Sequence, residues 1–206
     1  MPPIGRRRLH QPQAILDAAR TLVVEEGTRA ATVESIAGAS GAPIGSIYHA
    51  FGSRDALLAR LWIRAVGRSQ ARFLEALQEE GDPRDAAVAA ALSVYDFARE
   101  EPGDARLLAS LRREDLIQMP LPAGLAAELA ELNRPLEKAL VTLARRLFGR
   151  AGKERIEQVA LATFDLPNGA LRRHLLAGRR PPAAARPALA RAVRAALEPD
   201  DRQEAS

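Results

Sequence analysis

The stretch from Thr32 to Leu57 reads TVESIAGASGAPIGSIYHAFGSRDAL, and it constrains the local fold more than any other part of the chain. It contains two short apolar segments, which are separated by the small residues GASGA at positions 38–42. Thr32 is suited to capping a first helix, and Pro43 is suited to the first turn of a second, where its missing N–H would be unpaired in any case. The pattern predicts two short helices joined by a tight corner, as in a helix-turn-helix.

The remaining sequence shows apolar residues at helical spacing, with no alternating strand pattern and no internal repeat. Aromatic residues make up only 4% of the chain, whereas 47% of its residues are hydrophobic. This composition favours helices and is sufficient for a sizeable core. We therefore predict an all-α fold, with a kink near Pro135 and an interruption at 167–169. The expected helices cover residues 12–26, 32–37, 43–51, 53–80, 84–100, 104–118, 124–148, 153–178 and 184–197.

Glycine and proline breaks divide the predicted helices into a small N-terminal group and a larger group that follows it. We predict a helix-turn-helix domain at residues 9–69, with the motif itself at 32–51, and a second helical domain at residues 70–198. The two ends, residues 1–8 and 199–206, are predicted to be flexible tails, the first of them basic.

Several classes of protein are excluded or disfavoured by what the sequence lacks. The chain has no cysteine, which excludes disulfides, thiolate metal sites and cysteine nucleophiles. It has no run of about eighteen apolar residues and no signal-peptide pattern behind its first arginines. We therefore expect a cytoplasmic protein without a membrane segment, and we expect neither a metal nor a cofactor.

The excess positive charge lies in the N-terminal third of the chain. Residues 1–70 contain nine arginines and five acidic residues, whereas residues 71–206 contain 21 basic and 21 acidic residues. The formal net charge of +4 therefore lies in the first 70 residues, which contain the basic tail and the predicted helix-turn-helix domain. Positive charge attracts the phosphates of nucleic acid, although an excess of this size can also arise by chance.

The second helix of the motif carries side chains suited to a DNA major groove, which admits a single helix. Ile44 could contact a thymine methyl group, Gly45 would let the backbone approach closely, and Ser46 offers a hydroxyl group to a base or a phosphate. Tyr48 and His49 follow one turn later and suit phosphate oxygens. Each of these residues alone could be ordinary surface, but their order together favours a DNA-reading helix.

Residues 9–69 resemble the N-terminal domain of the TetR family of bacterial transcriptional regulators. The family pattern is a threonine-led helix, Ile-Ala, an Ala-Gly corner, and Gly-x-x-Tyr-x-His-Phe followed by a basic residue before a leucine. The matching positions are Thr32, Ile36, Ala37, Ser40, Gly41, Gly45, Tyr48, Phe51, Arg54 and Leu57. Arg54 adds positive charge where the amides of a helix N-terminus already favour an anion. The predicted DNA-contacting residues are Thr32, Pro43, Ile44, Gly45, Ser46, Tyr48, His49 and Arg54.

Three positions depart from the family pattern. Ser40 replaces the corner alanine, which is a small change. Pro43 stands where a capping serine or threonine is usual, so we expect a hydrogen bond to be missing at the start of that helix. Ala50 stands where the family often has histidine, and His49 is turned by roughly 100° from that position.

The resemblance also implies that the second domain holds a small-molecule pocket and dimerises through its last two helices. The candidate pocket residues, each of which could also be ordinary core or surface, are Tyr95, Phe97, Arg99, Met119 and Phe148. The candidate dimer residues form apolar stripes: Ile156, Val159, Phe164, Leu189 and Val193. Periodicity alone slightly favours stripes that pack within one chain, but two DNA-reading helices need a two-fold partner to read a palindrome.

An enzyme would need a convergent group of acid, base or nucleophile residues. The three histidines, His10, His49 and His174, are far apart in the sequence, and no metalloprotease or serine-elbow motif is present. We expect no catalytic residue. The sequence predicts a homodimeric DNA-binding regulator that a small-molecule ligand releases from a palindromic double-stranded operator, and repression rather than activation follows from the resemblance. The alternative is a helical small-molecule-binding protein or enzyme with a vestigial DNA-binding head.

Overall fold

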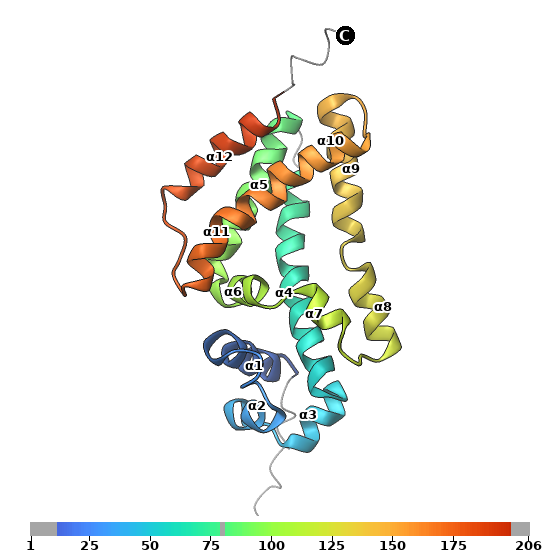
Figure 1. The fold of residues 1–206 in the computed structure, drawn as a ribbon, viewed down its shortest axis with the longest axis vertical. Coiled ribbons are helices and arrows are strands. Elements are labelled where there is room, and N and C mark those ends of the chain that lie inside the picture. Colours follow the sequence, from blue (N-terminus) through green and yellow to red (C-terminus); the bar gives the residue numbers. More distant parts are fainter. Residues whose placement is uncertain (1–11, 79–80, 199–206) are drawn as a thin grey trace, which may run out of the picture. The chain divides into compact units, whose positions relative to one another are not determined.

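The computed structural model describes residues 12–78 and 81–198, and over these residues every regular element is a helix. The prediction of an all-α fold is confirmed. The predicted tails, 1–8 and 199–206, lie outside the described residues. The chain forms two compact units (Figure 1), of which the first combines Met1–Ile63 with Ser110–Leu129 and the second combines Arg64–Ala109 with Ala130–Ser206.

The first unit contains the predicted helix-turn-helix. Its helices are α1 (Pro12–Glu26), α2 (Val33–Ser40), α3 (Ile44–Phe51), the beginning of α4 (Arg54–Leu77), α7 (Arg113–Ile117) and most of α8 (Ala123–Glu131). The start of α4 is capped by Ser53, whose hydroxyl oxygen accepts a hydrogen bond from the Ala56 N–H at 3.1 Å. The core of the unit consists of buried aliphatic side chains from α1 to α4: Ile15, Leu16, Ala19, Val23, Ile36, Ile47, Leu57, Leu58 and Leu61.

Residues 110–129 belong to the first unit although they lie far along the chain. The buried indole N–H of Trp62 donates to the Leu111 carbonyl at 3.1 Å. Leu125 of α8 packs against the buried alanines Ala56 and Ala59 of α4. A domain boundary placed at a single sequence position between 69 and 70 does not describe this grouping, because the contacts return to α4 from a later segment.

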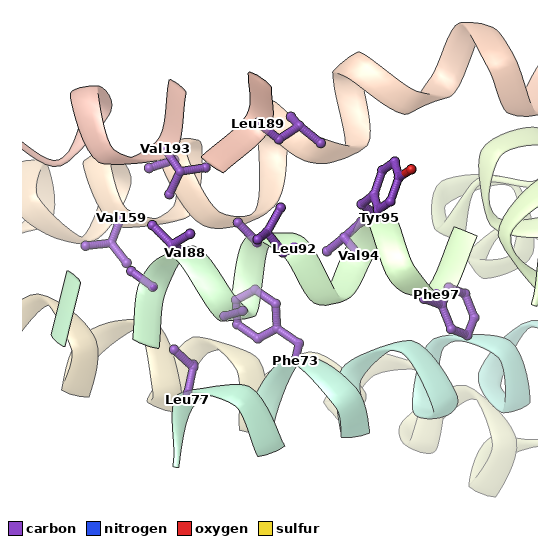
Figure 2. Close-up of a cluster of buried hydrophobic side chains, with 14 of the residues drawn as sticks. Phe73, Leu77, Val88, Leu92, Val94, Tyr95, Phe97, Val159, Leu189 and Val193 are labelled. Atoms are coloured by element: carbon purple, nitrogen blue, oxygen red, sulfur yellow. The ribbon is translucent and has the colours of Figure 1, made fainter. Parts of the chain in front are cut away.

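The second unit is built around α5 (Pro83–Glu100), in which ten residues are buried. The helices packed with it are the rest of α4, α6 (Pro102–Ser110), α9 (Arg134–Phe148), α10 (Lys153–Ala160), the π-helical turn η1 (Leu161–Asp165), α11 (Leu166–Leu176) and α12 (Ala185–Ala196). Figure 2 shows Val88 and Leu92 of α5 between Phe73 of α4 and Val193 of α12. The apolar layer formed by α4, α5 and α12 is therefore continuous.

Ion pairs on the surface join α12 to α5. Arg186 binds Asp96 through two hydrogen bonds of 3.1 Å, and the bonded carboxylate raises the pKa of the Arg186 guanidinium. Arg194 pairs with Asp85 at 2.6 Å. Exposed pairs of this kind contribute roughly 1 kcal/mol or less. The position of α12 therefore depends mainly on its buried side chains.

Three predicted helices differ from the observed ones. The segment 104–118 is divided into α6 and α7, because Arg112 has an extended backbone and Leu111 uses its carbonyl to bind an indole. The segment 124–148 is broken at 132–133 rather than kinked, and Pro135 lies in the first turn of α9, where no N–H is needed.

The segment predicted at 153–178 is helical from 153 to 176, with a π-helical turn in place of the predicted interruption. Pro167 has no N–H to donate to the Thr163 carbonyl, four residues earlier. The turn at 161–165 ends two residues before this proline. Widening one turn is a usual way for a helix to accommodate a missing hydrogen bond.

Candidate nucleic-acid interface

The corner between α2 and α3 is fixed by a glycine and a serine. Gly41 ends α2 with φ of 68°, a left-handed conformation that favours glycine. The Ser40 hydroxyl donates to the Ile36 carbonyl at 2.7 Å and accepts from the Ala42 N–H at 3.2 Å. The replacement of alanine by serine at the corner therefore adds hydrogen bonds on both sides of the turn, which an alanine could not make.

The start of α2 is capped as predicted. The Thr32 hydroxyl oxygen accepts from the Ser35 N–H at 3.1 Å, and the Ser35 hydroxyl lies 2.6 Å from the Ala30 carbonyl oxygen. Together these bonds tie the loop before α2 to its first turn. The exposed Thr32 side chain is thus held at a helix N-terminus, which is a favourable place for an anion.

Replacing the cap gives a first test of this local structure. Thr32→Ala should lower the free energy of unfolding of the first unit by about 1 kcal/mol, whereas Thr32→Ser should keep most of it. Urea unfolding followed by tryptophan fluorescence suits this test, because Trp62 is the single tryptophan and is buried in the first unit. Equal stability of the alanine variant and the original chain would show that the cap is replaced by other contacts.

Helix α3 has one buried and one exposed apolar side. Ile47 is 1% exposed and anchors the helix, whereas Ile44 is 43% and Tyr48 is 49% exposed. Ile44 and Tyr48 are four residues apart and therefore share a face. Gly45, Ser46, His49 and Ala50 are also exposed. This short helix therefore presents a mixed apolar and polar surface that nothing among the described residues covers.

The first turn of α3 has free hydrogen-bonding capacity. Pro43 precedes the helix, and no side chain caps it, so the predicted loss of a capping bond is confirmed. The Pro43 carbonyl accepts from the N–H groups of Ser46 and Ile47 at 2.9 and 3.2 Å. The amides before them point out of the helix start, where a phosphate oxygen can be accepted.

The side chain of Arg54 has an internal role that the sequence did not suggest. Its Nε donates to the Ala31 carbonyl at 2.8 Å, and Nη2 donates to the Thr28 carbonyl. Nη1 lies 3.4 Å from the Asp55 carboxylate. The guanidinium thereby ties the loop between α1 and α2 to the start of α4, and its side chain remains 31% exposed.

A second arginine, which lies in the loop between α1 and α2, has a different setting. Arg29 is exposed, and its side chain has no ion-pair or hydrogen-bond partner within residues 12–78 and 81–198. It lies three residues before the cap of α2. Arg29 is one of the nine arginines in the N-terminal charge excess, but nothing in the sequence distinguishes it from a paired arginine.

The five candidate pocket residues make separate contacts within the chain. Tyr95 and Arg99 bind the loop before α12, with the tyrosine hydroxyl donating to the Pro182 carbonyl at 3.2 Å and Arg99 donating to the Pro181 carbonyl at 3.0 Å. The other three have separate surroundings: Phe97 is buried beneath Arg72, Phe148 lies beneath Arg155, and Met119 belongs to the first unit.

The candidate dimer residues divide in the same way. Val159, Leu189 and Val193 are buried in the core of their own chain, so their side chains are not free to contact a partner. Ile156 is half-buried against the same core, and Phe164 is 39% exposed. Helical periodicity located these stripes correctly but could not tell an internal contact from an external one.

Two further observations concern metal sites and membrane-spanning helices among the described residues. Within 12–78 and 81–198, no group of three or more histidine, aspartate or glutamate side chains is placed to hold a metal ion. No helix in the same range is long and apolar enough to cross a membrane.

Comparisons with known proteins agree with this architecture. Residues 15–61, which run from α1 to the start of α4, match the family model of bacterial regulatory proteins, tetR family. No match was found among curated proteins.

Solved structures of transcriptional regulators are similar over nearly the whole chain. The ketosteroid regulator KstR2 of Mycobacterium tuberculosis is 17% identical, with coverage of 95% of both chains and a TM-score of 0.67. PfmR of Thermus thermophilus, a TetR family regulator, is 20% identical, covering 89% of this chain and 96% of its own, with a TM-score of 0.68.

FadR of Bacillus subtilis, solved with stearoyl-CoA, is 16% identical, covering 90% of this chain and 96% of its own, with a TM-score of 0.69. At such identities the likeness establishes the fold, and the match at residues 15–61 establishes the kind of N-terminal domain. Residues 15–61 therefore match the tetR family of bacterial regulatory proteins, and the chain has the fold of the solved transcriptional regulators.

Proposed function

We propose that the protein is a homodimeric repressor that binds a palindromic operator in double-stranded DNA and releases it when a small-molecule effector binds the second unit. One observation carries the proposal: α3 is anchored by the buried Ile47 and leaves Ile44 and Tyr48 exposed on one face. An uncovered apolar face on a short helix, next to uncapped amides and arginines, suits insertion into a major groove.

The residues of α3 divide into two groups by their chemistry. Ile44, Gly45 and Ser46 lie in the first turn, and we assign them to base contacts, with the isoleucine against a thymine methyl group. Tyr48 and His49 follow, and we assign them to phosphate oxygens, which position the helix without reading sequence. Arg29 and the exposed part of Arg54 supply positive charge for the same backbone.

Dimerisation is proposed from the symmetry that a palindrome requires. Exposed apolar side chains remain on the penultimate helical segment, where Leu161, Phe164 and Leu176 are 53%, 39% and 52% exposed. These three residues replace the buried Val159, Leu189 and Val193 as the proposed contacts with a second copy.

An effector would act by favouring one arrangement of the dimer over another. In the DNA-binding arrangement the two α3 helices must match successive major grooves, roughly 34–36 Å apart. A ligand that binds more tightly to a dimer with a different spacing lowers the population able to bind the operator. The related fold of FadR was solved with stearoyl-CoA, which supports proposing an effector with an apolar portion.

A gel-shift titration tests the proposal directly. The purified chain should retard at least one fragment from the region upstream of its own gene at low ionic strength, with an affinity that falls steeply as salt is added. Failure to retard any such fragment, by a chain that is folded, would contradict the proposal.

Variants of α3 should separate base contacts from phosphate contacts. Tyr48→Phe should weaken binding to operator and random DNA by a similar factor, about fivefold, because a phosphate contact carries no sequence information. Ile44→Ser should instead change which operator bases are preferred, with discrimination at one base pair changing by roughly 1–3 kcal/mol. Competition experiments with single-base operator variants measure both effects. An Ile44 variant that lowers affinity for every sequence equally would argue against a base contact.

A further inference from the structure

Helices α4 and α9 of the second unit leave a cleft of about 270 Å³, termed here the α4–α9 cleft. The apolar part of its lining consists of Leu74 and Leu77 from α4 with Ala139 and Leu143 from α9. Figure 2 shows Leu77 at the edge of the buried cluster, on the same helix as Phe73. The cleft is therefore an opening at the margin of the hydrophobic core.

The polar part of the lining is positively charged. Lys138, Thr142 and Arg146 line the cleft from α9, and their spacing of four residues places them along one face of that helix. All three are exposed, as is Gln78 from α4, so the cleft opens to solvent. No carboxylate is among the described residues that line the cleft.

Lys138 and Arg146 differ from several arginines of the second unit, which face carboxylates. Arg68, Arg72, Arg186 and Arg194 pair with acidic side chains. Lys138 has no such partner within the described residues.

Arg146 also lacks an acidic partner among the described residues. Its guanidinium donates only to the Leu77 and Gly81 carbonyls, at the long distances of 3.3 and 3.4 Å. The cleft therefore has positive charge that the described part of the chain does not neutralise, and this charge lies beside an apolar surface.

We propose that the α4–α9 cleft binds an amphipathic anion, whose aliphatic chain lies against the leucines and whose acidic group lies near Thr142 between Lys138 and Arg146. An anion bonded to a lysine or arginine gains charge-assisted hydrogen bonds, which are the stronger kind. An apolar chain in the cleft removes leucine surface from water. A cation would be repelled, and a neutral ligand would make no use of the charge.

The volume of the cleft limits the size of the ligand that it can hold. Small-molecule pockets usually measure roughly 300–1,000 Å³, so a cleft of about 270 Å³ suits one short or medium aliphatic chain rather than a fused-ring molecule. The part of this inference that makes the α4–α9 cleft the effector site rests on the proposed function. Binding of the anion itself does not depend on DNA and can be measured without it.

Calorimetry on the full chain with decanoate as the probe tests the site. Decanoate should bind saturably, decanol should bind at least about tenfold more weakly, and decyltrimethylammonium should not bind, because each lacks the anionic group. Lys138→Gln should weaken decanoate binding about tenfold through the loss of one charged hydrogen bond. Ala139→Leu should weaken it comparably by filling the cleft.

The matched control is Arg145→Gln. Arg145 is an exposed cation on the same helix, next to Arg146, but it does not line the cleft. This variant should bind decanoate within about twofold of the original chain, since screened surface charge has a small effect. Thermal unfolding verifies that each variant is folded.

The inference is overturned if decanoate does not bind, if decanol binds equally well, or if folded Lys138→Gln and Ala139→Leu variants bind decanoate as tightly as Arg145→Gln. Adding decanoate to the operator complex separates this result from the proposed function. Saturable binding at the cleft without release of DNA would support the site and contradict the effector mechanism. Release of DNA that the cleft variants leave unchanged would support an effector but place it elsewhere.

Discussion

Gly45→Leu should weaken operator binding by about a hundredfold while leaving the protein folded and slightly more stable. A Cβ atom added at Gly45 would meet no other atom within 4 Å, so the chain itself has room for a side chain there. Leucine is also a better helix former than glycine, by roughly 0.5–1 kcal/mol. If the first turn of α3 approaches DNA closely, the same side chain occupies the space that the bases need.

Gly38→Leu is the matched control for this experiment. Gly38 lies in α2, is exposed, and also has no neighbour within 4 Å of an added Cβ. Both leucine variants should gain stability in urea, but only the Gly45 variant should lose operator affinity in a fluorescence-anisotropy titration. Equal affinity of the two variants would show that the first turn of α3 does not approach DNA closely.

A graded series of side chains at position 45 tests whether their size causes the loss of operator affinity. Gly45→Ala adds a single methyl group and should lower affinity by only a few-fold, with further loss as the side chain grows. Because stability and affinity are expected to move in opposite directions, loss of folding cannot be mistaken for loss of a DNA contact.

Local sequence signals predicted the N-terminal helices well. Thr32, Pro43 and Gly41 each act through their own backbone or through a neighbour a few residues away, so their effect can be read without a structure. These are the features that form a helix-turn-helix, and they explain why its bounds were predicted within a few residues.

Features that depend on distant parts of the chain could not be predicted in the same way. The break after α6 requires the contact of Leu111 with Trp62, 49 residues earlier. The stripes containing Val159 and Val193 are apolar whether they pack on their own chain or on a partner, so periodicity alone cannot decide between the two contacts. The α4–α9 cleft combines residues more than 60 positions apart, and no motif marks it.

Arg54 is the residue at which the sequence and the structure suggest different roles, and Arg54→Lys should distinguish them. Lysine keeps the charge for a phosphate but cannot make the forked contact with two carbonyls. We expect Arg54→Lys to lower the free energy of unfolding of the first unit by about 2 kcal/mol, the value of a hydrogen bond to a charged group. The carbonyl of Ala31, a residue that is itself fully buried, would lose its partner.

Arg29→Gln provides the matched comparison, because Arg29 is in the loop that Arg54 binds and its exposed side chain has no partner among the described residues. This variant should unfold within about 0.5 kcal/mol of the original chain but bind all DNA more weakly, with a shallower dependence on salt. Urea unfolding monitored at Trp62 and anisotropy at several salt concentrations give both quantities. If Arg54→Lys were as stable as the original chain and Arg54→Gln lost only DNA affinity, the guanidinium would serve mainly the phosphate. If Arg54→Lys loses stability as expected, its main role is to hold the loop before α2 against α4, and that loop positions the cap on which α2 and the corner to α3 depend.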